Sequence, residues 1–174
     1  MDLHSFEVDD LYFDKPVEVE VISLLEKAAE AYEDGESEPF LLKAQQLAPN
    51  NLMVLVGLYR FYYYQHRYED ALNIAEQSLR TSGKLFNFDR NWRQMNLEAM
   101  SYGLLESFGM VRFYLLALKG SGYLCLRLGQ IDEGIERLEK VVELDSSDRL
   151  GAGHLLEVAY NQKGIYSLKH RMSA

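Results

Sequence analysis

The chain has 174 residues, of which 48% are hydrophobic and 26% charged, a composition typical of one compact folded domain. Its single cysteine, Cys125, excludes an intramolecular disulfide framework and a cysteine-based zinc site. A formal net charge of −9 argues against nucleic-acid binding by the whole molecule. No apolar run approaches the roughly 20 residues that span a bilayer, so we expect no membrane contact. The acidic start of the chain is unlike the basic opening of a signal peptide, and we expect a cytoplasmic protein.

The acidic charge is concentrated at the N-terminus. Residues 1–38 contain 13 acidic and two basic side chains, a net charge of −11, whereas residues 39–174 carry a net charge of +2. The acidic part is either a solvated segment followed by a polar helix, or a segment that pairs with basic groups on the molecule or on a partner. We divide the chain into an acidic N-terminal segment, 1–16, and a helical domain, 17–174.

Apolar residues recur at helical spacing and do not alternate as they do in a half-buried strand, which predicts an all-α fold. The predicted helices cover, in chain order, 17–33, 37–47, 52–65, 68–82, 110–128, 131–144 and 148–163. Within an insertion at about 83–109, Asp89 is a candidate cap for a short helix through Met95, and 96–107 is a further helix. Asp148 is the candidate N-cap of the last helix, which would cap the end of a helical stack.

Three segments repeat one spacing of apolar and small residues. In the clearest segment it is carried by Leu55, Leu58, Tyr59, Tyr62, Tyr68, Ala71 and Ala75. A step of 34 residues back from Ala71 gives Ser37, Leu41, Ala44 and Pro49, and the third copy contains Leu118, Gly122, Cys125, Gly129, Ile131, Gly134, Leu138 and Val141. The small residues Ala71, Gly122 and Gly134 would let paired helices approach closely.

This pattern resembles the tetratricopeptide repeat, in which helix-turn-helix units stack into an α-solenoid. The resemblance covers about 18–51, 52–82 and 115–148, and implies about three repeats, a helical insertion and a C-terminal capping helix. About 29 residues are inserted ahead of the third repeat. Three positions depart from the family pattern: His66 replaces the usual turn glycine, Cys125 the usual tyrosine and Ser146 the usual proline.

In this family the first helix of each repeat lines a concave face that binds peptides. The resemblance places on that face Met53, Val56, Arg60, Tyr63, Tyr64, Leu116, Lys119, Tyr123, Arg127, His154 and Tyr160. Arginine and tyrosine dominate binding hot spots, and three cations, Arg60, Lys119 and Arg127, would favour an acidic or amphipathic peptide or a terminal carboxylate. Alternatively, the tyrosines belong to the core and the arginines extend to solvent. Tyr123 stands where chaperone-docking members have asparagine, which argues against a heat-shock-protein ligand.

The N-terminal segment itself has the composition of such a ligand. We hypothesise that residues 2–14 fold back into the groove, or into that of a second copy, and compete with the partner. The alternative is a disordered start.

We expect neither an enzyme nor a bound metal or cofactor. The histidines at 4, 66, 154 and 170 form no i,i+4 pair. The glycines of 119–129 lie inside a predicted helix rather than after a strand, so they form no phosphate loop. Cys125 is expected to be an inert core thiol. The basic residues around Trp92 are too sparse for a nucleic-acid site, and we expect Trp92 to anchor the insertion or to contact a protein.

The sequence therefore predicts a non-catalytic, protein-binding adaptor or chaperone. It is similar to the type III secretion chaperones that carry three such repeats after an N-terminal helix, although they lack the insertion. Residues 57–72 and 118–134 also resemble small bacterial repeat proteins that accompany nitrogen-fixation gene clusters, which implies an accessory role around metalloenzyme assembly. A further alternative is self-association, with the tyrosine-rich helix 52–65 as a homodimer face.

Overall fold

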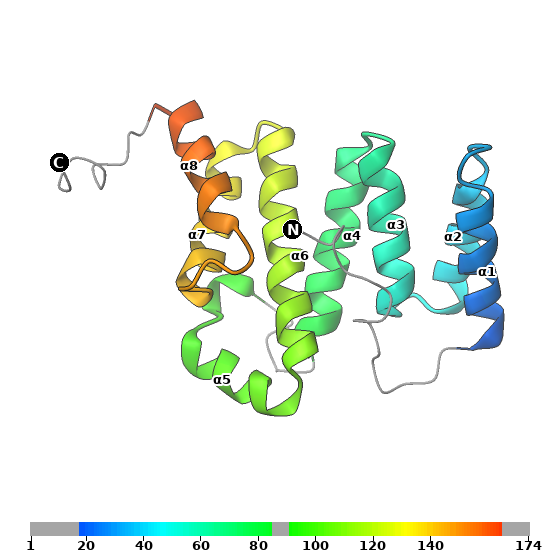
Figure 1. Ribbon diagram of the computed structural model, residues 1–174, viewed down its shortest axis with the longest axis horizontal. Coiled ribbons are helices and arrows are strands. Elements are labelled where there is room, and N and C mark those ends of the chain that lie inside the picture. The colour runs from blue at the N-terminus through cyan, green and yellow to red at the C-terminus, as the bar shows by residue number, and fades with distance from the viewer. Residues whose placement is uncertain (1–17, 85–90, 165–174) are drawn as a thin grey trace.

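The computed structural model describes residues 18–84 and 91–164, and this part of the chain contains helices and turns but no strand (Figure 1). The prediction of an all-α fold is therefore confirmed. The elements in chain order are α1 Val19–Glu30, α2 Ser37–Leu47, α3 Leu52–Tyr64, α4 Tyr68–Gly83, the 3-10 turn η4 Trp92–Gln94, α5 Leu97–Glu106, α6 Phe108–Arg127, α7 Ile131–Leu144 and α8 Ala152–Gln162.

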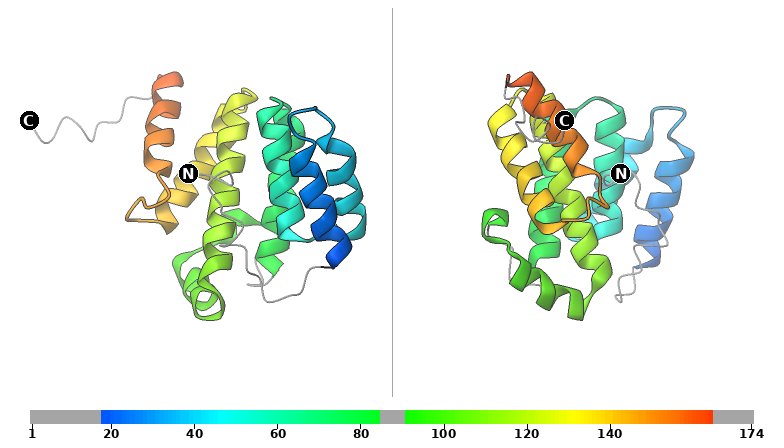
Figure 2. Two further views of the ribbon diagram at one scale, coloured as in Figure 1. Left: turned by 45° about the vertical axis from the view of Figure 1, so that its right-hand side comes forward. Right: turned by 60° about the vertical axis from the view of Figure 1, so that its left-hand side comes forward.

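The helices are stacked as successive hairpins. Helix α1 packs against α2, α3 against α4 and α6 against α7; the hairpins meet through α2–α3 and α4–α6, and α7 carries α8. Figures 1 and 2 show the resulting row, with α1 and α2 at one end and α8 at the other. Helix α6 lies inside the row, where residues 113–122 are all buried. The helix-turn-helix units agree with the sequence, and their assignment to tetratricopeptide repeats stays a prediction.

The three hairpin turns share one backbone geometry. Each contains a residue in the left-handed conformation: Gly35 with φ 75°, His66 with φ 57° and Gly129 with φ 77°. The amide of the following residue, at 36, 67 or 130, donates to the carbonyl five positions back, at 3.1, 2.9 and 2.8 Å. This bond pattern closes a helix C-terminus around a left-handed residue. His66 thus adopts the turn conformation for which the repeat pattern expects glycine.

Helices α6 and α7 touch through two glycines, as predicted. A Cβ atom on Gly134 would lie 2.6 Å from Cδ2 of Leu126 and 2.9 Å from the carbonyl oxygen of Gly122. A Cβ on Gly122 would lie 3.1 Å from Cγ of Leu138. Because neither position has room for a side chain, the two backbones approach more closely than any other residue pair there would allow.

The predicted start of the last helix is wrong. Asp148 has a left-handed φ of 48°, and α8 begins only at Ala152. The Asp148 carboxylate still accepts a hydrogen bond from the Gly153 amide at 3.0 Å, so it satisfies a first-turn donor from outside the helix. In the insertion, η4 is a single 3-10 turn capped by the side chain of Asn91; the predicted cap, Asp89, lies outside the described residues.

Trp92 anchors the insertion, as predicted. Its side chain is buried in the core together with Met95 and Ala99. Helix α5 then packs against α6 and leaves an apolar surface in solvent, where Leu105 is 85% exposed and Phe108 is 64% exposed.

Replacing Gly134 with alanine tests the contact between α6 and α7. We expect Gly134→Ala to lower the free energy of unfolding by about 1–3 kcal/mol, because the added Cβ meets a backbone oxygen that cannot move aside. Urea denaturation at constant m-value measures the change.

Gly109→Ala is the matched control, since Gly109 also lies in α6 but a Cβ there meets no atom within 4 Å. It should be neutral or stabilising by up to about 1 kcal/mol, through helix propensity alone. Equal effects of the two substitutions would contradict the packing argument.

Candidate functional site

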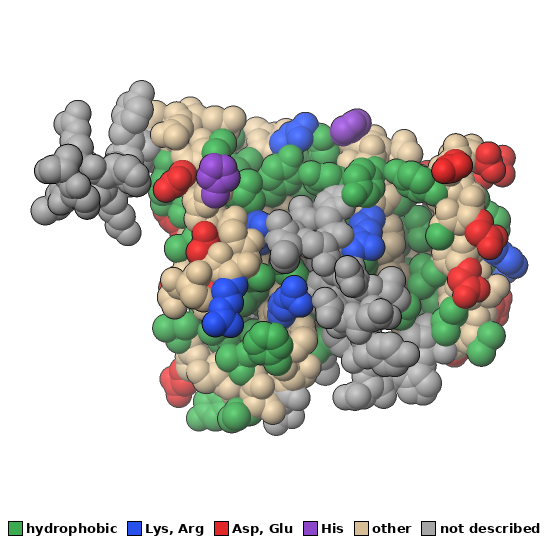
Figure 3. All heavy atoms as spheres, viewed as in Figure 1, with side chains coloured by type: hydrophobic (Ala, Val, Ile, Leu, Met, Phe, Trp, Pro, Cys, Tyr) green, Lys and Arg blue, Asp and Glu red, His purple; other side chains and the backbone are tan. Residues whose placement is uncertain are grey.

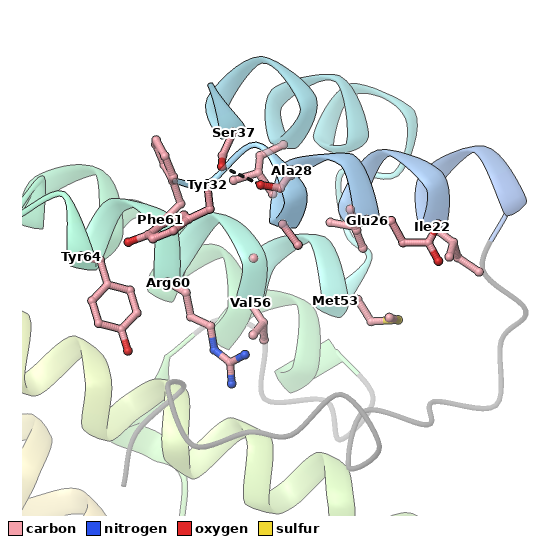
Figure 4. A pocket seen from close by; sticks show the side chains of 14 residues that line it. Ile22, Glu26, Ala28, Tyr32, Ser37, Met53, Val56, Arg60, Phe61 and Tyr64 are labelled. Atoms are coloured by element: carbon pink, nitrogen blue, oxygen red, sulfur yellow. Dashed lines mark hydrogen bonds between the residues drawn. The ribbon is translucent and has the colours of Figure 1, made fainter. Parts of the chain in front are cut away.

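A groove of about 750 Å³ lies between α1, α2 and α3 (Figure 4). Ile22 and Met53 lie toward one end of it, and Tyr32 and Tyr64 toward the other. The residues that line it are Ile22, Leu25, Glu26, Ala28, Ala29, Tyr32, Ser37, Leu41, Met53, Val56, Gly57, Arg60, Phe61 and Tyr64. Most of these side chains are apolar, and Glu26 and Arg60 are the two charged residues among them.

The groove exists because the first hairpin packs closely on α3 only through part of its surface. Gly57 supplies the point of contact: a Cβ there would lie 3.2 Å from Cδ2 of Leu41 and 3.6 Å from Cδ2 of Leu25. Away from that point, Ile22 stays 38% exposed and Tyr64 stays 56% exposed. Apolar side chains left half-covered beside a concavity are a common feature of binding sites.

Four of the predicted site residues line this groove. They are Met53, Val56, Arg60 and Tyr64, all on α3. Val56 is 3% exposed and forms part of the floor, whereas Met53 and Arg60 are half-buried and Tyr64 is exposed at the rim.

The prediction that Lys119 adds a second cation to the same groove is wrong. Its side chain is 3% exposed, and Nζ donates a hydrogen bond to the carbonyl oxygen of Leu150 at 2.7 Å. Leu116 is likewise 1% exposed. The physical reason is the central position of α6, which is packed between α4 and α7. A lysine in such a place is tolerated because a backbone carbonyl pairs with its ammonium group.

The third predicted cation, Arg127, belongs to an aromatic cluster between α3, α4 and α6. Its guanidinium lies 4.5 Å from the ring centroid of Tyr68, and Nη1 donates to the Tyr123 hydroxyl at 2.9 Å. The Tyr63 ring lies 6.0 Å from that of Tyr123. The hydrogen bond to the Tyr123 hydroxyl raises the pKa of Arg127. The side chains of this cluster therefore contact one another: Tyr63, Tyr123 and Arg127. The predicted concave face with three cations is thus corrected to a groove that is lined by one of them, Arg60.

The last two predicted residues lie on α8, at the opposite end of the row (Figure 1). His154 is exposed, and the Tyr160 hydroxyl donates to Glu139 at 2.5 Å. Burial and this carboxylate raise the pKa of Tyr160 to about 12. Neither residue lines the groove.

Sequence reasoning missed the contribution of α1. This helix carries two apolar stripes. Val21, Leu24 and Ala28 are buried, and Ala28 also borders the groove; Ile22, Leu25 and Ala29, continued by Tyr32 in the turn after the helix, form the second stripe and line the groove. The second stripe follows the spacing i, i+3, i+7, i+10, which is itself a helical face. A surface helix needs one apolar face, so the second stripe was the available signal for a binding surface.

A second cluster of functional groups surrounds Arg137, whose side chain is 8% exposed between α4, α6 and α7. Nη1 lies 2.5 Å from Glu76 Oε1 and donates to Ser121 Oγ at 2.8 Å, and Nη2 lies 2.8 Å from Glu133 Oε1. The Trp92 ring centroid lies 5.2 Å from its guanidinium carbon. The charge is thus compensated on every side, as a buried ion must be.

Cys125 lies near this cluster and carries no sign of activation. The thiol is 1% exposed, and burial raises its pKa to about 11 although Arg137 acts in the opposite direction. A reactive cysteine needs a lowered pKa and access to solvent. Within 18–84 and 91–164, no group of three or more His, Cys, Asp or Glu side chains could hold a metal ion. Over the same residues, no helix combines the length and the apolar character needed to cross a bilayer.

Comparison with known proteins gives one informative relative. No protein-family model matches the chain. Over 158 residues it is 51% identical to a protein of Azotobacter chroococcum mcd 1 described as an "Uncharacterized 19.8 kDa protein in nifW 5'region", and the match covers 91% of this chain and 88% of that protein. The chain belongs to the family of that protein. The shared length extends over most of the molecule rather than over a single hairpin.

Arg137→Met tests the buried cluster. It removes the cation that Glu76 and Glu133 share from a position that is 8% exposed, while Glu133 keeps its pair with Arg93, so we expect a loss of roughly 3 kcal/mol in the free energy of unfolding. Chemical denaturation followed by circular dichroism measures it.

Arg93→Met is the matched control, because Arg93 also contacts Glu133 and lies 4.2 Å from the Trp92 ring but is 42% exposed. Its loss should cost no more than about 1 kcal/mol. A larger effect at Arg93 than at Arg137 would contradict the assignment of the cluster as a buried structural centre.

Proposed function

We propose that this chain is a non-catalytic protein-binding adaptor or chaperone, and that the groove between α1, α2 and α3 takes an amphipathic or acidic peptide segment of its partner. The observation that carries the proposal is the groove itself, which has a volume of about 750 Å³ and a lining dominated by apolar side chains. The groove runs along two neighbouring helices, α1 and α3, a shape that suits an extended or helical peptide.

The residue types in the groove support a peptide rather than a small polar ligand. Tyr32 and Tyr64 are 43% and 56% exposed, and each offers a large apolar ring with a hydroxyl that can bond a peptide backbone. Arg60 can pair with a carboxylate by a charge-assisted hydrogen bond. Glu26, on the opposite helix, would disfavour a second acidic group close to α1. An amphipathic segment with its acidic residues toward Arg60 and away from Glu26 fits the charges of both side chains.

The non-catalytic part of the proposal is supported by the state of the reactive groups. Arg137, Glu76 and Glu133 bind one another, and the Cys125 thiol is buried with a raised pKa. A general acid or base needs a pKa close to the working pH and access to a substrate.

The setting that we propose is an accessory role in nitrogen fixation. The relative is described as a protein of the nifW 5' region, and two stretches of the sequence resemble proteins that accompany such gene clusters. In that role the groove would hold a segment of a protein during assembly of a metalloenzyme.

The groove is tested with peptides selected from a random library on the full-length chain. We expect them to lose at least about tenfold in affinity for Ile22→Glu, because a carboxylate at the groove wall must lose its hydration when a peptide covers it. Isothermal titration calorimetry gives the affinities.

Leu42→Glu is the matched control: Leu42 and Ile22 are both 38% exposed, but Leu42 does not line the groove. Binding to this variant should equal that of the wild type. Peptides that bind Ile22→Glu as tightly as wild type would refute the groove as the binding site.

Self-association is a second candidate function, favoured by an exposed apolar surface on α5 and the start of α6. Leu97, Tyr102, Leu105 and Phe108 are between 53% and 85% exposed. Contiguous apolar surface of more than a few hundred Å² is uncommon on monomers and marks interaction sites. This surface is a better homodimer face than the predicted helix 52–65, in which Leu55, Leu58, Tyr59 and Tyr62 are buried inside the chain.

We expect the wild type to sediment as a dimer at high concentration and the double variant Leu105→Glu/Phe108→Glu to stay monomeric, because two carboxylates would be buried in the interface. Sedimentation velocity over a concentration series measures this. Leu47→Glu/Val158→Glu is the control, since both residues are 44% exposed but lie on α2 and α8. A wild type that remains monomeric throughout rules out this second function.

A further inference from the structure

We propose that the acidic, aromatic segment ahead of α1, residues 3–14, is itself a ligand of the groove between α1, α2 and α3 of its own chain, and that it regulates the site by competing with the partner's peptide. This inference rests on the proposed function for its regulatory consequence but not for the contact itself. Residues 1–17 lie outside the described residues; the point where the chain enters α1, the composition of the segment and the charge of the face it would reach all favour this contact.

The attachment point brings the segment to the groove. Helix α1 begins at Val19, and the first groove-lining residue, Ile22, follows within one helical turn. Ile22 lies at the same end of the groove as Met53 (Figure 4). The groove runs along α3, which has 13 residues and so is about 20 Å long. Twelve extended residues reach about 40 Å. The segment can therefore turn back and span the whole groove.

The composition of the segment matches the groove. Residues 3–14 contain six apolar or aromatic side chains, Leu3, Phe6, Val8, Leu11, Tyr12 and Phe13, interspersed with acidic ones. The floor and walls of the groove are mostly apolar, so burial of an aromatic or large aliphatic side chain there stabilises the contact. An amphipathic segment of this kind is the ligand class that we propose for the partner.

Charge favours the same placement. Residues 1–17 carry five acidic side chains and one basic, a net charge of −4. On the face that Figure 3 shows, Lys and Arg side chains are most evident in the middle, over α3 and α6, and Asp and Glu side chains are concentrated toward the two ends, over α1–α2 and α7–α8, where further Lys and Arg side chains also lie. Arg60 of α3 is the one basic residue among the described residues that line the groove. An acidic segment is attracted to the middle of the face and repelled from its ends.

Covalent attachment makes the competition effective. A ligand on a short linker is present at an effective concentration of about 1 mM or more, whatever the protein concentration. If the segment occupies the groove about nine-tenths of the time, the apparent affinity for a partner peptide falls about tenfold. A partner must therefore exceed the segment in affinity before it binds, which makes the groove selective.

Paramagnetic relaxation in the full-length chain tests the contact without any partner. Cys125 is replaced by Ala, and Ser5→Cys carries a nitroxide. We expect the amide signals of Ala29 and Gly57, which line the groove, to broaden, while those of Gly134 and Gly153 in α7 and α8 do not. Ile22→Glu should reverse the broadening, and Leu42→Glu should leave it unchanged. Unbroadened Ala29 and Gly57 signals in the labelled chain overturn the inference.

A mixed sample separates the chain's own groove from that of a second copy. Isotope-labelled chain without nitroxide is combined with nitroxide-labelled chain of natural isotope abundance. If the groove signals broaden here as much as in the chain that carries both the isotope label and the nitroxide, the segment binds a second copy and the intramolecular assignment is overturned. If they do not broaden in the mixed sample, the intramolecular assignment is supported.

The regulatory step is measured separately. Phe6→Ser/Leu11→Ser/Phe13→Ser in the full-length chain should raise the affinity for the library-selected peptides about tenfold, and an unchanged affinity overturns the competition. These outcomes can be distinguished from failure of the proposed function. If library peptides bind in the groove but the nitroxide broadens no groove signal, the adaptor proposal stands and the inference about the segment fails. If the nitroxide broadens the groove signals but no library peptide binds there, the segment is the ligand and the adaptor proposal fails.

Discussion

The buried guanidinium of Arg137 is the constraint on which the centre of the molecule depends. A charge in that position requires partners from every element around it, and it has them in Glu76 of α4, Ser121 of α6 and Glu133 of α7, with Trp92 of the insertion against its face. Glu133 also pairs with Arg93, next to Trp92. One side chain thereby fixes two hairpins and the insertion in a single arrangement, while the two glycines between α6 and α7 set how closely the helices meet.

The end of the row formed by α1 and α2 is built differently. Its contact with α3 is made through apolar side chains around Gly57. The groove lies at this less constrained end, whereas the Arg137 cluster stabilises the other hairpins. This arrangement suits the proposed binding role, because the Arg137 cluster ties the central helices together while apolar surface remains available at the other end.

The sequence was most reliable where a local pattern determined a local structure. The spacing of apolar residues predicted the helices, and Gly122 and Gly134 predicted the close contact of α6 with α7. It was least reliable for Lys119 and Arg127. Both occupy positions that a regular repeat would expose on one concave face, but α6 is packed between α4 and α7, so Lys119 is buried on the Leu150 carbonyl and Arg127 lies on Tyr68. The spacing of residues in a helix predicts which side chains share a face, but it does not predict which other elements pack on that face.

By itself the sequence determined the helical class, the hairpin order and the concentration of acidic charge ahead of α1, because each depends on residue type and on spacing along the chain. Only the tertiary structure decided that a groove forms to which α1 contributes Ile22 and Leu25 and the following turn Tyr32, that one predicted cation lines it, and that Arg137 is a structural centre. These outcomes depend on contacts between helices distant in sequence. The free energy of such contacts depends on which side chains bury and pair with one another, and the spacing of residues along the chain does not determine this.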